Sequence, residues 1–408
     1  MKPIVSLLLF CALITTSQMK GQTAEELHRK ANTYAASGKY SEAIVLYNKS
    51  IETKPTAEAY NDLGISYGNL GQFDNEIPCY QKALELRPQY ADALTNLGNA
   101  YSSKGQYDKA IESFRSSIDR NPDNPNTLYN LAIALSATEN DYKAVDEFRK
   151  AIELNPQFVN AHVNLGIVFN KIGEFTKATD EFKEAIAINS DLPDAWRNLG
   201  NSYAYAENYD KAIESYKRAI YLKPDYAEAY SNLGIIYSTQ GNDDLAIEQY
   251  KLGISKDPKF AQNHLHLGNA YLNKKETDKA IASFIEAIRL APNYTKAHYN
   301  LGIAYESVNE HDKAIQAFSE GTKVAPKDPL MYYNLGLIYA NKGQDTLAAG
   351  YWNHVLKLNP KFADAYYGLG MIAGQHEMIE DKIKYFQLAA RNGNIKAQEY
   401  LQKIDQKW

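Results

Sequence analysis

Small and aromatic residues recur along this chain with a period of 34 residues. Glycine or alanine marks every interval of one series: Gly64, Gly98, Ala132, Gly166, Gly200, Gly234, Gly268, Gly302, Gly336 and Gly370. An aromatic series keeps the same register: Tyr80, Phe114, Phe148, Phe182, Tyr216, Tyr250, Phe284, Phe318, Trp352 and Phe386. Alanines between the two series and prolines near the end of most units repeat at the same interval. A fixed period of this length predicts a stacked array of repeated structural units.

Each unit has the pattern of two amphipathic helices. Counted from the first residue of a unit, positions 7, 8 and 11 share one helical face, as Leu233, Gly234 and Tyr237 do. The small residue at position 8 allows the second helix to approach closely, which offsets its cost of roughly 0.5–1 kcal/mol in helix propensity. The pattern therefore predicts two helices that pack through a glycine or alanine.

Turn and end signals divide the two helices. Position 15 is often glycine, which suits a left-handed residue at the end of the first helix: Gly71, Gly105, Gly173, Gly241 and Gly343. Aspartate recurs at position 18, where we expect its carboxylate to cap the second helix: Asp74, Asp108, Asp210, Asp244, Asp278 and Asp312. A proline such as Pro122 then ends that helix.

The run Leu97-Gly98-x-x-Tyr101, followed by Ala110, Phe114 and Pro122, resembles the tetratricopeptide repeat. The resemblance extends from Ala24 to about residue 396, with Glu76 and Lys382 in place of the expected alanine. The copies start near residues 24, 57, 91, 125, 159, 193, 227, 261, 295, 329 and 363. The resemblance implies an all-α fold, an α-solenoid of about eleven helix-turn-helix repeats over residues 22–396 that winds as a right-handed superhelix. A C-terminal capping helix is expected at residues 397–408.

The N-terminus indicates a bacterial-type signal peptide at residues 1–21. Lys2 supplies the positive charge, and Ile4–Ile14 forms an apolar run that is short for a membrane span. Cleavage after Ser17 and cleavage after Gly21 both fit, and a retained N-terminal anchor is the alternative. Bulky Phe10 before Cys11 disfavours a lipid anchor. We therefore expect export to the periplasm or out of the cell.

Charge and composition exclude several classes of function. The net charge is −5, with no cluster of lysine and arginine, so a nucleic-acid partner is not expected. Two cysteines, Cys11 and Cys79, cannot form a disulfide framework after cleavage of the signal peptide. The eight histidines lack metal-ligand spacing, and no phosphate-binding loop or nucleophile elbow occurs. We expect no catalytic residue, no metal site and no cofactor, so the chain is predicted not to be an enzyme.

Position 6 of the repeats carries a ladder of nine polar residues, seven of which are asparagine. Asparagine is a poor helix former, so its repetition inside a helix calls for a reason. The ladder is Asp62, Asn96, Asn130, Asn164, Asn198, Asn232, His266, Asn300 and Asn334. It is similar to the asparagine ladder in the repeat region of O-GlcNAc transferases, which implies contact with a peptide backbone. The alternative is that each amide bonds to the neighbouring repeat and only orders the stack.

Tyrosines add candidate peptide contacts at position 5 of the last three units: Tyr299, Tyr333 and Tyr367. Acidic residues such as Glu58 and Asp364 lie on the expected groove, which favours a neutral or basic partner over a carboxylate tail. We predict an exported protein-interaction scaffold whose groove takes an extended peptide or partner segment. Two alternatives are the substrate-recognition component of a glycosyltransferase-like system and a self-assembling structural repeat protein.

Overall fold

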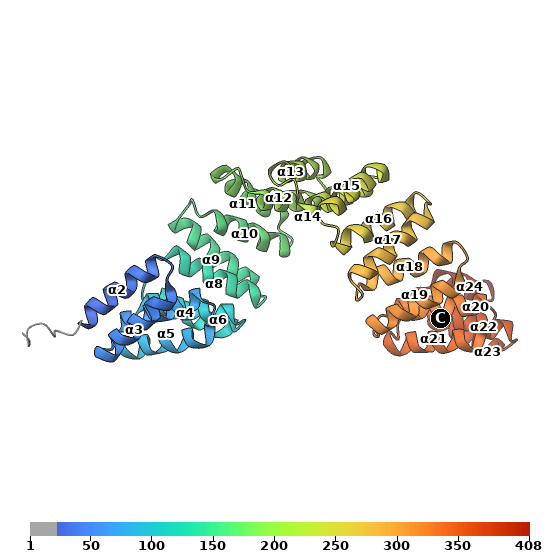
Figure 1. Cartoon of the computed structure of the whole chain (residues 1–408). Helices are drawn as coiled ribbons and strands as arrows, with labels where there is room; N and C mark the ends of the chain where they lie inside the picture. The colour runs from blue at the N-terminus through green and yellow to red at the C-terminus, as the bar shows by residue number, and fades with distance from the viewer. Residues whose placement is uncertain (1–22) are drawn as a thin grey trace, which may run out of the picture. The chain divides into compact units, whose positions relative to one another are not determined.

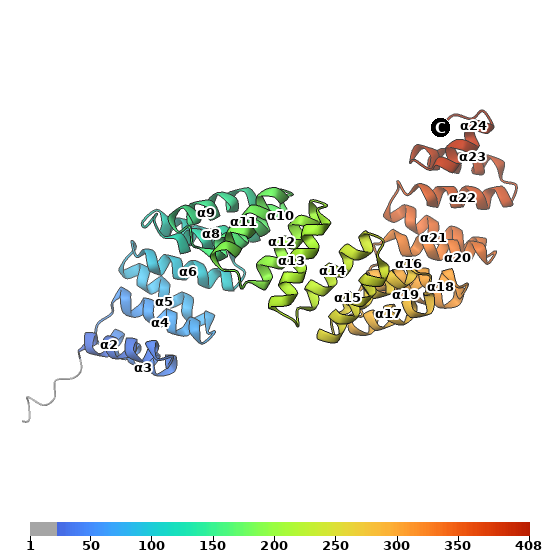
Figure 2. The ribbon, with the colours of Figure 1, turned by 90° about the horizontal axis from the view of Figure 1, so that it is seen from above.

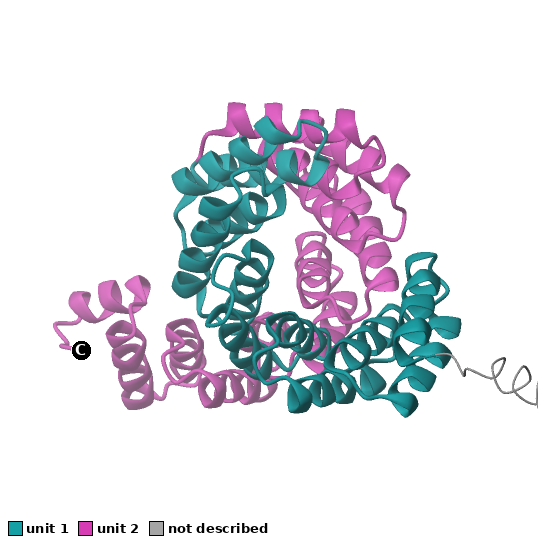
Figure 3. Cartoon of the chain, turned by 90° about the vertical axis from the view of Figure 1, so that its left-hand side faces the viewer, with its two compact units in different colours: residues 1–206 teal, residues 207–408 magenta. Residues whose placement is uncertain are grey.

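The computed structural model describes residues 23–408, and within them every regular element is an α-helix (Figure 1). The predicted signal peptide lies outside the described residues. The chain divides into two compact units, residues 1–206 and residues 207–408 (Figure 3). The boundary falls between the two helices of the repeat that starts at Pro193. Each unit is an array of helical hairpins, so the predicted α-solenoid architecture is confirmed.

The first helices of the repeats begin at the residues that the 34-residue period predicts. They are α2 (Ala24–Ala36), α4 (Ala57–Asn69), α6 (Ala91–Ser103), α8 (Pro125–Ala137), α10 (Val159–Lys171), α12 (Pro193–Tyr205), α14 (Ala227–Thr239), α16 (Ala261–Asn273), α18 (Thr295–Ser307), α20 (Pro329–Asn341) and α22 (Ala363–Gln375).

Each first helix is followed by a second helix of similar length. These are α3 (Tyr40–Thr53), α5 (Phe73–Leu86), α7 (Tyr107–Ile118), α9 (Asp141–Leu154), α11 (Phe175–Ile188), α13 (Tyr209–Leu222), α15 (Asp243–Lys256), α17 (Thr277–Leu290), α19 (His311–Val324), α21 (Asp345–Leu358) and α23 (Ile379–Arg391). Within each compact unit, the second helix of a repeat packs on the first helix of its own repeat and on the first helix of the next repeat.

A final helix, α24 (Ile395–Lys403), packs on α23 and starts two residues before the predicted capping helix. Its Ala397 and Leu401 are fully buried. Figure 2 shows α20, α21, α22, α23 and α24 following one another as successive layers. α24 thus takes the place of a further first helix and covers the apolar side of α23. No helix in residues 23–408 has both the length and the apolar character needed to cross a membrane.

The core of each repeat is the contact between the position 8 residue and the aromatic ring at position 24. The Phe114 and Phe182 rings have no solvent exposure. A Cβ atom added to Gly98 would lie 2.5 Å from Phe114 Cε1, and one added to Gly166 would lie 2.8 Å from Phe182 Cζ. The alanine series at position 20 is equally buried, as Ala110 shows. The small residue at position 8 therefore gives the ring its space, as the sequence predicts.

Left-handed backbone at position 15 ends the first helices. Gly71, Gly105, Gly173, Gly241 and Gly343 all have positive φ, which confirms the turn prediction. Where glycine is missing, another residue adopts the same conformation, such as Glu139 at a φ of 61° or Lys275 at 62°. The geometry of the turn is therefore kept even where its usual residue is not.

The prediction that aspartate at position 18 caps the second helix is wrong. The helices begin one residue earlier or more, with Gln72 and Gln106 as the N-cap residues of α5 and α7. Asp74, Asp108, Asp210, Asp244, Asp278 and Asp312 lie instead in the first helical turn. There a carboxylate favours the helix dipole. Some also pair with a lysine of the next repeat, as Asp74 does with Lys104 at 2.6 Å and Asp312 with Lys342 at 2.7 Å.

Candidate functional site

The ladder amides connect consecutive first helices. Asn96 Nδ2 donates to Asn61 Oδ1 at 3.0 Å, and Asn164 Nδ2 donates to the Tyr129 hydroxyl at 2.9 Å. Both acceptors lie at position 5 of the preceding repeat. The ladder therefore does order the stack, as the structural alternative expects.

A second kind of ladder bond uses position 9 of the preceding repeat. Asn130 Nδ2 donates to Asn99 Oδ1 at 2.9 Å, and Asn300 Nδ2 donates to Asn269 Oδ1 at 2.7 Å. In these four ladder residues the amide nitrogen is engaged. Their Oδ1 atoms accept no bond from the described part of the chain, and the residues are only half-buried. Contact of these oxygens with a peptide remains a prediction.

The remaining ladder residues have different surroundings. Asp62 pairs with His28 at 2.8 Å and also accepts from Asn61 Nδ2 at 3.1 Å. Asn198 is buried, and Asn334 Nδ2 donates to Leu330 O of its own helix at 2.8 Å. Asn232 is half-buried in α14. The ladder is thus regular in sequence but not in hydrogen bonding.

His266 stands out among the ladder residues because its ring is part of the packing. Its ring stacks on Tyr250 with centroids 5.7 Å apart, and its Nε2 is buried without a partner in the described residues. Burial, with a contribution from the Lys296 charge, lowers the pKa of His266 to about 4. The imidazole is therefore neutral at physiological pH and adds no positive charge to this face.

The three candidate tyrosines are half-buried, each with its ring against another aromatic ring. Tyr299 meets Phe318 edge-on with centroids 6.0 Å apart, and Tyr367 stacks on Phe386 at 5.1 Å. Tyr333 packs on Phe362 at 5.1 Å. Packing therefore fixes each ring in place and leaves part of it accessible.

Tyr333 and Tyr367 also line a hollow of about 660 Å³ at the C-terminal end of the array. Leu337 and Met371, at position 9 of α20 and α22, share the hollow, and residues 393–396 close one side of it. A Cβ atom on Gly368 would lie 2.6 Å from Trp352 Cζ3, which explains why the ladder ends in glycine. The sequence-predicted stripe thus forms a concave, partly apolar site here.

Position 9 lies on the stripe that helical spacing predicts to face the groove, but its residues were not among the candidates predicted from the sequence. Ile65, Ile133 and Ile167 are 38–42% exposed, and Met371 is 45% exposed. Each lies three residues after the ladder position on a first helix. Exposed aliphatic side chains at one position of several repeats offer apolar contact area to a ligand. Their 34-residue recurrence was visible in the sequence, but only the solvent exposure distinguishes them from core residues.

Position 4 is a packing position, as expected from its place in the repeat. Its polar side chains form hydrogen bonds with the backbone carbonyl oxygen six residues earlier. His162 Nε2 lies 3.2 Å from Pro156 O, and Trp196 Nε1 donates to Ser190 O at 3.1 Å. The same holds for the Tyr332 hydroxyl with Pro326 O at 3.4 Å.

Within residues 23–408, no cluster of three or more histidine, cysteine or acidic side chains could hold a metal ion.

One buried cluster of ionisable groups lies in the second repeat. Cys79 is 8% exposed, and burial raises the pKa of its thiol to about 11. A protonated thiol is a poor nucleophile at neutral pH. Glu76 is 7% exposed, its Oε1 accepts from the Tyr80 hydroxyl at 3.1 Å, and its Oε2 has no partner in the described residues. The cluster therefore buries a carboxylate that is only partly hydrogen-bonded within the described residues.

Glu76→Ala is expected to stabilise the protein in a pH-dependent way. Burial raises the pKa of Glu76, so the folded state favours the protonated acid, and stability falls as pH rises through that pKa. The gain from the variant should reach about 1 kcal/mol at pH 8 and shrink towards pH 4.5. Urea unfolding at the two pH values measures this difference. A gain that is independent of pH would contradict the assignment to the carboxylate.

Comparisons with known proteins agree with the repeat geometry. Models described as tetratricopeptide repeat match residues 91–124, 125–158, 227–260, 295–328 and 330–362. A further TPR repeat model matches residues 31–71, 69–105, 168–205, 200–241 and 274–309. The chain belongs to the tetratricopeptide repeat family. The helical hairpins of both units are therefore tetratricopeptide repeats, an architecture of protein-interaction scaffolds.

Individual relatives of this repeat protein are distant. The mitochondrial import receptor subunit TOM70 of Saccharomyces cerevisiae is 33% identical over 79 residues, which are 19% of this chain and 13% of TOM70. The match therefore spans a small part of that receptor. A crystal structure of yeast Tom70 aligns with 94% of this chain and 95% of its own at 18% identity, with a TM-score of 0.46.

A tetratricopeptide repeat protein from Parabacteroides merdae gives a TM-score of 0.50 at 18% identity, covering 61% of this chain and 98% of its own. MamA from Desulfovibrio magneticus gives 0.40 at 22% identity, covering 42% and 96%. At these identities the Parabacteroides structure supports the fold alone.

Proposed function

We propose that this tetratricopeptide repeat protein is an exported scaffold that binds an extended peptide or partner segment along its first helices. The observation that carries the proposal is the row of exposed position 9 side chains, Ile65, Ile133 and Ile167, beside half-buried ladder amides. The aliphatic groups offer apolar contact area. The free Oδ1 atoms of Asn96, Asn130 and Asn164 offer acceptors for peptide N–H groups.

The ladder bonds support both roles of the asparagines. Because Nδ2 is held by the preceding repeat, the direction of Oδ1 is fixed before a ligand arrives. An acceptor that is already oriented loses less entropy on binding. Stack ordering and peptide contact are therefore compatible in Asn96, Asn130, Asn164 and Asn300.

The hollow at the C-terminal end would take an apolar side chain of the same kind of segment. Its walls are aromatic and aliphatic, from Tyr333, Leu337, Tyr367 and Met371. Asp364, which also lines it, accepts from Asn394 Nδ2 at 2.7 Å. A neutral or basic segment suits this hollow and the net charge of −5. In unit 1 the charge of Glu58 is offset, because Arg87 pairs with it and lowers its pKa.

Export is proposed from Lys2 and the apolar run Ile4–Ile14. Sequencing of the N-terminus of protein recovered from its native compartment tests it. A mature chain that begins at Gln18 or Gln22 would support export, and an intact N-terminus in the cytoplasm would contradict it.

Removing two exposed isoleucines of unit 1 tests the proposed groove. A library of random 12-residue peptides is selected against the wild-type protein, and affinities of the enriched peptides are then measured. Ile133→Ser with Ile167→Ser should weaken binding about tenfold, a loss of about 1.4 kcal/mol, because apolar contact is lost.

The matched control is Leu86→Ser with Leu154→Ser. These leucines are 50% and 43% exposed and lie near the ends of second helices in the same unit. The control should bind like the wild type. Equal losses in both variants, or no peptide enriched by the wild type, would reject the groove.

A further inference from the structure

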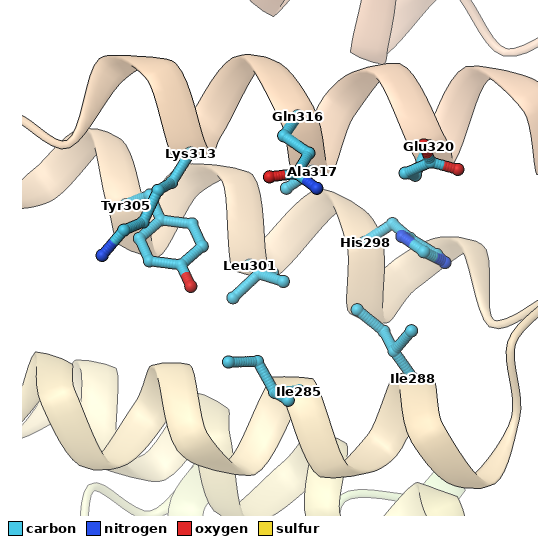
Figure 4. A pocket seen from close by; sticks show the side chains of 9 residues that line it. All are labelled: Ile285, Ile288, His298, Leu301, Tyr305, Lys313, Gln316, Ala317 and Glu320. Atoms are coloured by element: carbon cyan, nitrogen blue, oxygen red, sulfur yellow. The ribbon is translucent and has the colours of Figure 1, made fainter.

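A second hollow lies away from the ladder, between α17, α18 and α19 (Figure 4). Its volume is about 430 Å³. The aliphatic side chains of Ile285, Ile288 and Leu301 line it, with Ala317 on the opposite side and the Tyr305 ring at one end. These residues come from repeat positions 25, 28, 7, 23 and 11. None belongs to positions 5, 6 or 9, so the hollow is separate from the proposed groove.

A sister hollow at the same repeat positions in unit 1 shows what is unusual here. It has a similar volume of about 420 Å³ and lies between α7, α8 and α9. Arg115 occupies the place of Ile285, and Glu147 occupies the place of Ala317. The sister hollow therefore has charged side chains at two positions where the hollow at Ile285 has aliphatic ones.

In several repeats position 25 places a cation over the aromatic ring at position 11 of the next repeat. Arg149 lies 5.6 Å from the Phe169 ring centroid, and Lys251 lies 5.8 Å from that of Tyr271. Ile285 brings no cation to Tyr305, whose ring centroid lies 5.4 Å from Lys313 Nζ, and Ile285 is itself 47% exposed. Isoleucine in place of a cation at position 25 thus adds exposed apolar surface beside the hollow.

His298 adds one polar atom to this hollow. The side chain is 7% exposed and lines the hollow, and its Nε2 lies 2.9 Å from Pro292 O. A carbonyl oxygen only accepts, so Nε2 carries the proton, and Nδ1 of the neutral ring is an acceptor. No group in the described residues bonds to His298 Nδ1.

The equivalent histidine in unit 1 has the partner that His298 lacks. His162 Nδ1 lies 2.7 Å from Glu181 Oε2, and Glu181 stands at position 23. Ala317 occupies position 23 in the repeat of His298. The alanine therefore both empties the hollow and removes the partner of the imidazole.

Charges at the rim are already paired. Lys313 pairs with Glu310 at 2.6 Å, and Glu320 pairs with Lys323 at 2.6 Å. The hollow thus presents aliphatic walls and the acceptor of His298, and the side chains of Lys313, Gln316 and Glu320 also line it (Figure 4). A ligand that matches it is an apolar ring with one hydrogen-bond donor.

We propose that this hollow binds the indole side chain of a tryptophan on a partner protein. The indole N–H would donate to His298 Nδ1, and the ring would contact Ile285, Leu301 and Ala317. Indole has a donor and no acceptor. A phenol would add an acceptor oxygen that His298 does not satisfy, because the Nε2–H of His298 is bonded to Pro292 O. The hollow is therefore a second interaction surface of the scaffold, independent of peptide binding along the ladder.

Fluorinated ligands test the proposal without interference from the tryptophans of the protein. Binding of 5-fluoroindole and of 5-fluoro-1-methylindole to the full chain is measured by ¹⁹F NMR. We expect a dissociation constant of about 1 mM for 5-fluoroindole, as suits so small a ligand. Methylation removes the donor and should weaken binding at least about fivefold.

Two variants restore the residues of the sister sites. Ala317→Glu should pair with His298 and fill the hollow, and Ile285→Arg should cover it; each should weaken binding at least about tenfold. Ile285→Arg changes an exposed position where other repeats carry a base, so the variant should fold, as a thermal melt will show. The matched control is Arg115→Ile with Glu147→Ala, which gives the sister hollow the same aliphatic residues at positions 25 and 23 without supplying a histidine.

The control should leave the preference for 5-fluoroindole over its methylated form unchanged. Equal binding of the two ligands would overturn the role of His298 Nδ1, and undiminished binding by both variants would overturn the site. Tighter binding of 4-fluorophenol than of 5-fluoroindole would assign the hollow to a phenol instead. Failure of 5-fluoroindole to bind at 5 mM, about five times the expected constant, would reject the proposal.

Discussion

Gly166→Leu is expected to destabilise the protein by about 3 kcal/mol, because a leucine side chain has no space beside the buried Phe182 ring. Even a Cβ atom at this position would lie 2.8 Å from Phe182 Cζ, and the ring has no solvent exposure. The clash outweighs the gain of roughly 1 kcal/mol in helix propensity that comes from replacing a glycine inside a helix. Urea unfolding followed by circular dichroism measures the change.

Gly350→Leu is the matched control. Gly350 also lies inside a helix, α21, but no atom lies within 4 Å of its added Cβ. Leucine should therefore be neutral there or stabilise by up to about 1 kcal/mol. Adding Phe182→Ala to Gly166→Leu should recover part of the loss, since the leucine can enter the vacated volume. Similar losses at both glycines would show that the ring contact does not govern position 8.

The contact between position 8 and position 24 is also where sequence reasoning succeeded most. The residue at position 8 must be small and the ring at position 24 must be buried, so both residue types recur at fixed positions of the 34-residue period. The same register gave the first residue of every first helix, from Ala24 to Ala363. Periodicity succeeds here because each repeat solves the same packing problem with the same residue types.

The failure at position 18 has a local cause. Only one residue separates the left-handed position from the start of the second helix, as Gln72 does between Gly71 and Phe73. Asp74 is therefore already inside the helix and bonds outward to Lys104. A preference for aspartate near a helix start does not by itself distinguish a cap from the first turn.

The sequence shows two repeats without the usual alanine at position 20, but it was not recognised that a glycine at position 12 makes room for the larger residue. Glu76 and Lys382 replace the usual alanine at position 20, and glycine then stands at position 12 of the same repeat. A Cβ on Gly68 would lie 2.6 Å from Glu76 Oε1, and one on Gly374 would lie 3.0 Å from Lys382 Cδ. The pairs show that a long residue at position 20 requires an empty position 12.

The candidate site was predictable only in part. The ladder position follows from the period, but the partner of each amide depends on its neighbour. Asn130 bonds to Asn99 at position 9, whereas position 9 of the next repeat is the exposed Ile133, and Asn164 bonds to Tyr129 instead. The hydrogen-bond partner of each amide thus depends on side-chain geometry across two repeats, which the repeat pattern alone does not determine.

The second large effect concerns a buried asparagine in unit 2. Asn263 has no solvent exposure, and neither its Nδ2 nor its Oδ1 has a partner in the described residues. A Cβ atom on Gly253 would lie 2.5 Å from Asn263 Nδ2. Several other repeats carry alanine at both of these positions, as Ala83 and Ala93 do with no exposure. Gly253 thus makes room for an amide that gains no hydrogen bond.

Asn263→Ala combined with Gly253→Ala is expected to stabilise the protein by about 2 kcal/mol. The double variant removes two unpaired buried polar atoms and replaces a glycine inside α15. Gly253→Ala alone should destabilise, because its methyl group meets the amide, and Asn263→Ala alone should gain less than the pair, because a void remains at Gly253. A double-mutant cycle measured by urea unfolding gives the coupling directly. If the two changes simply add, or if the pair loses stability, then the amide has partners that stabilise it, and the packing argument for these two positions fails.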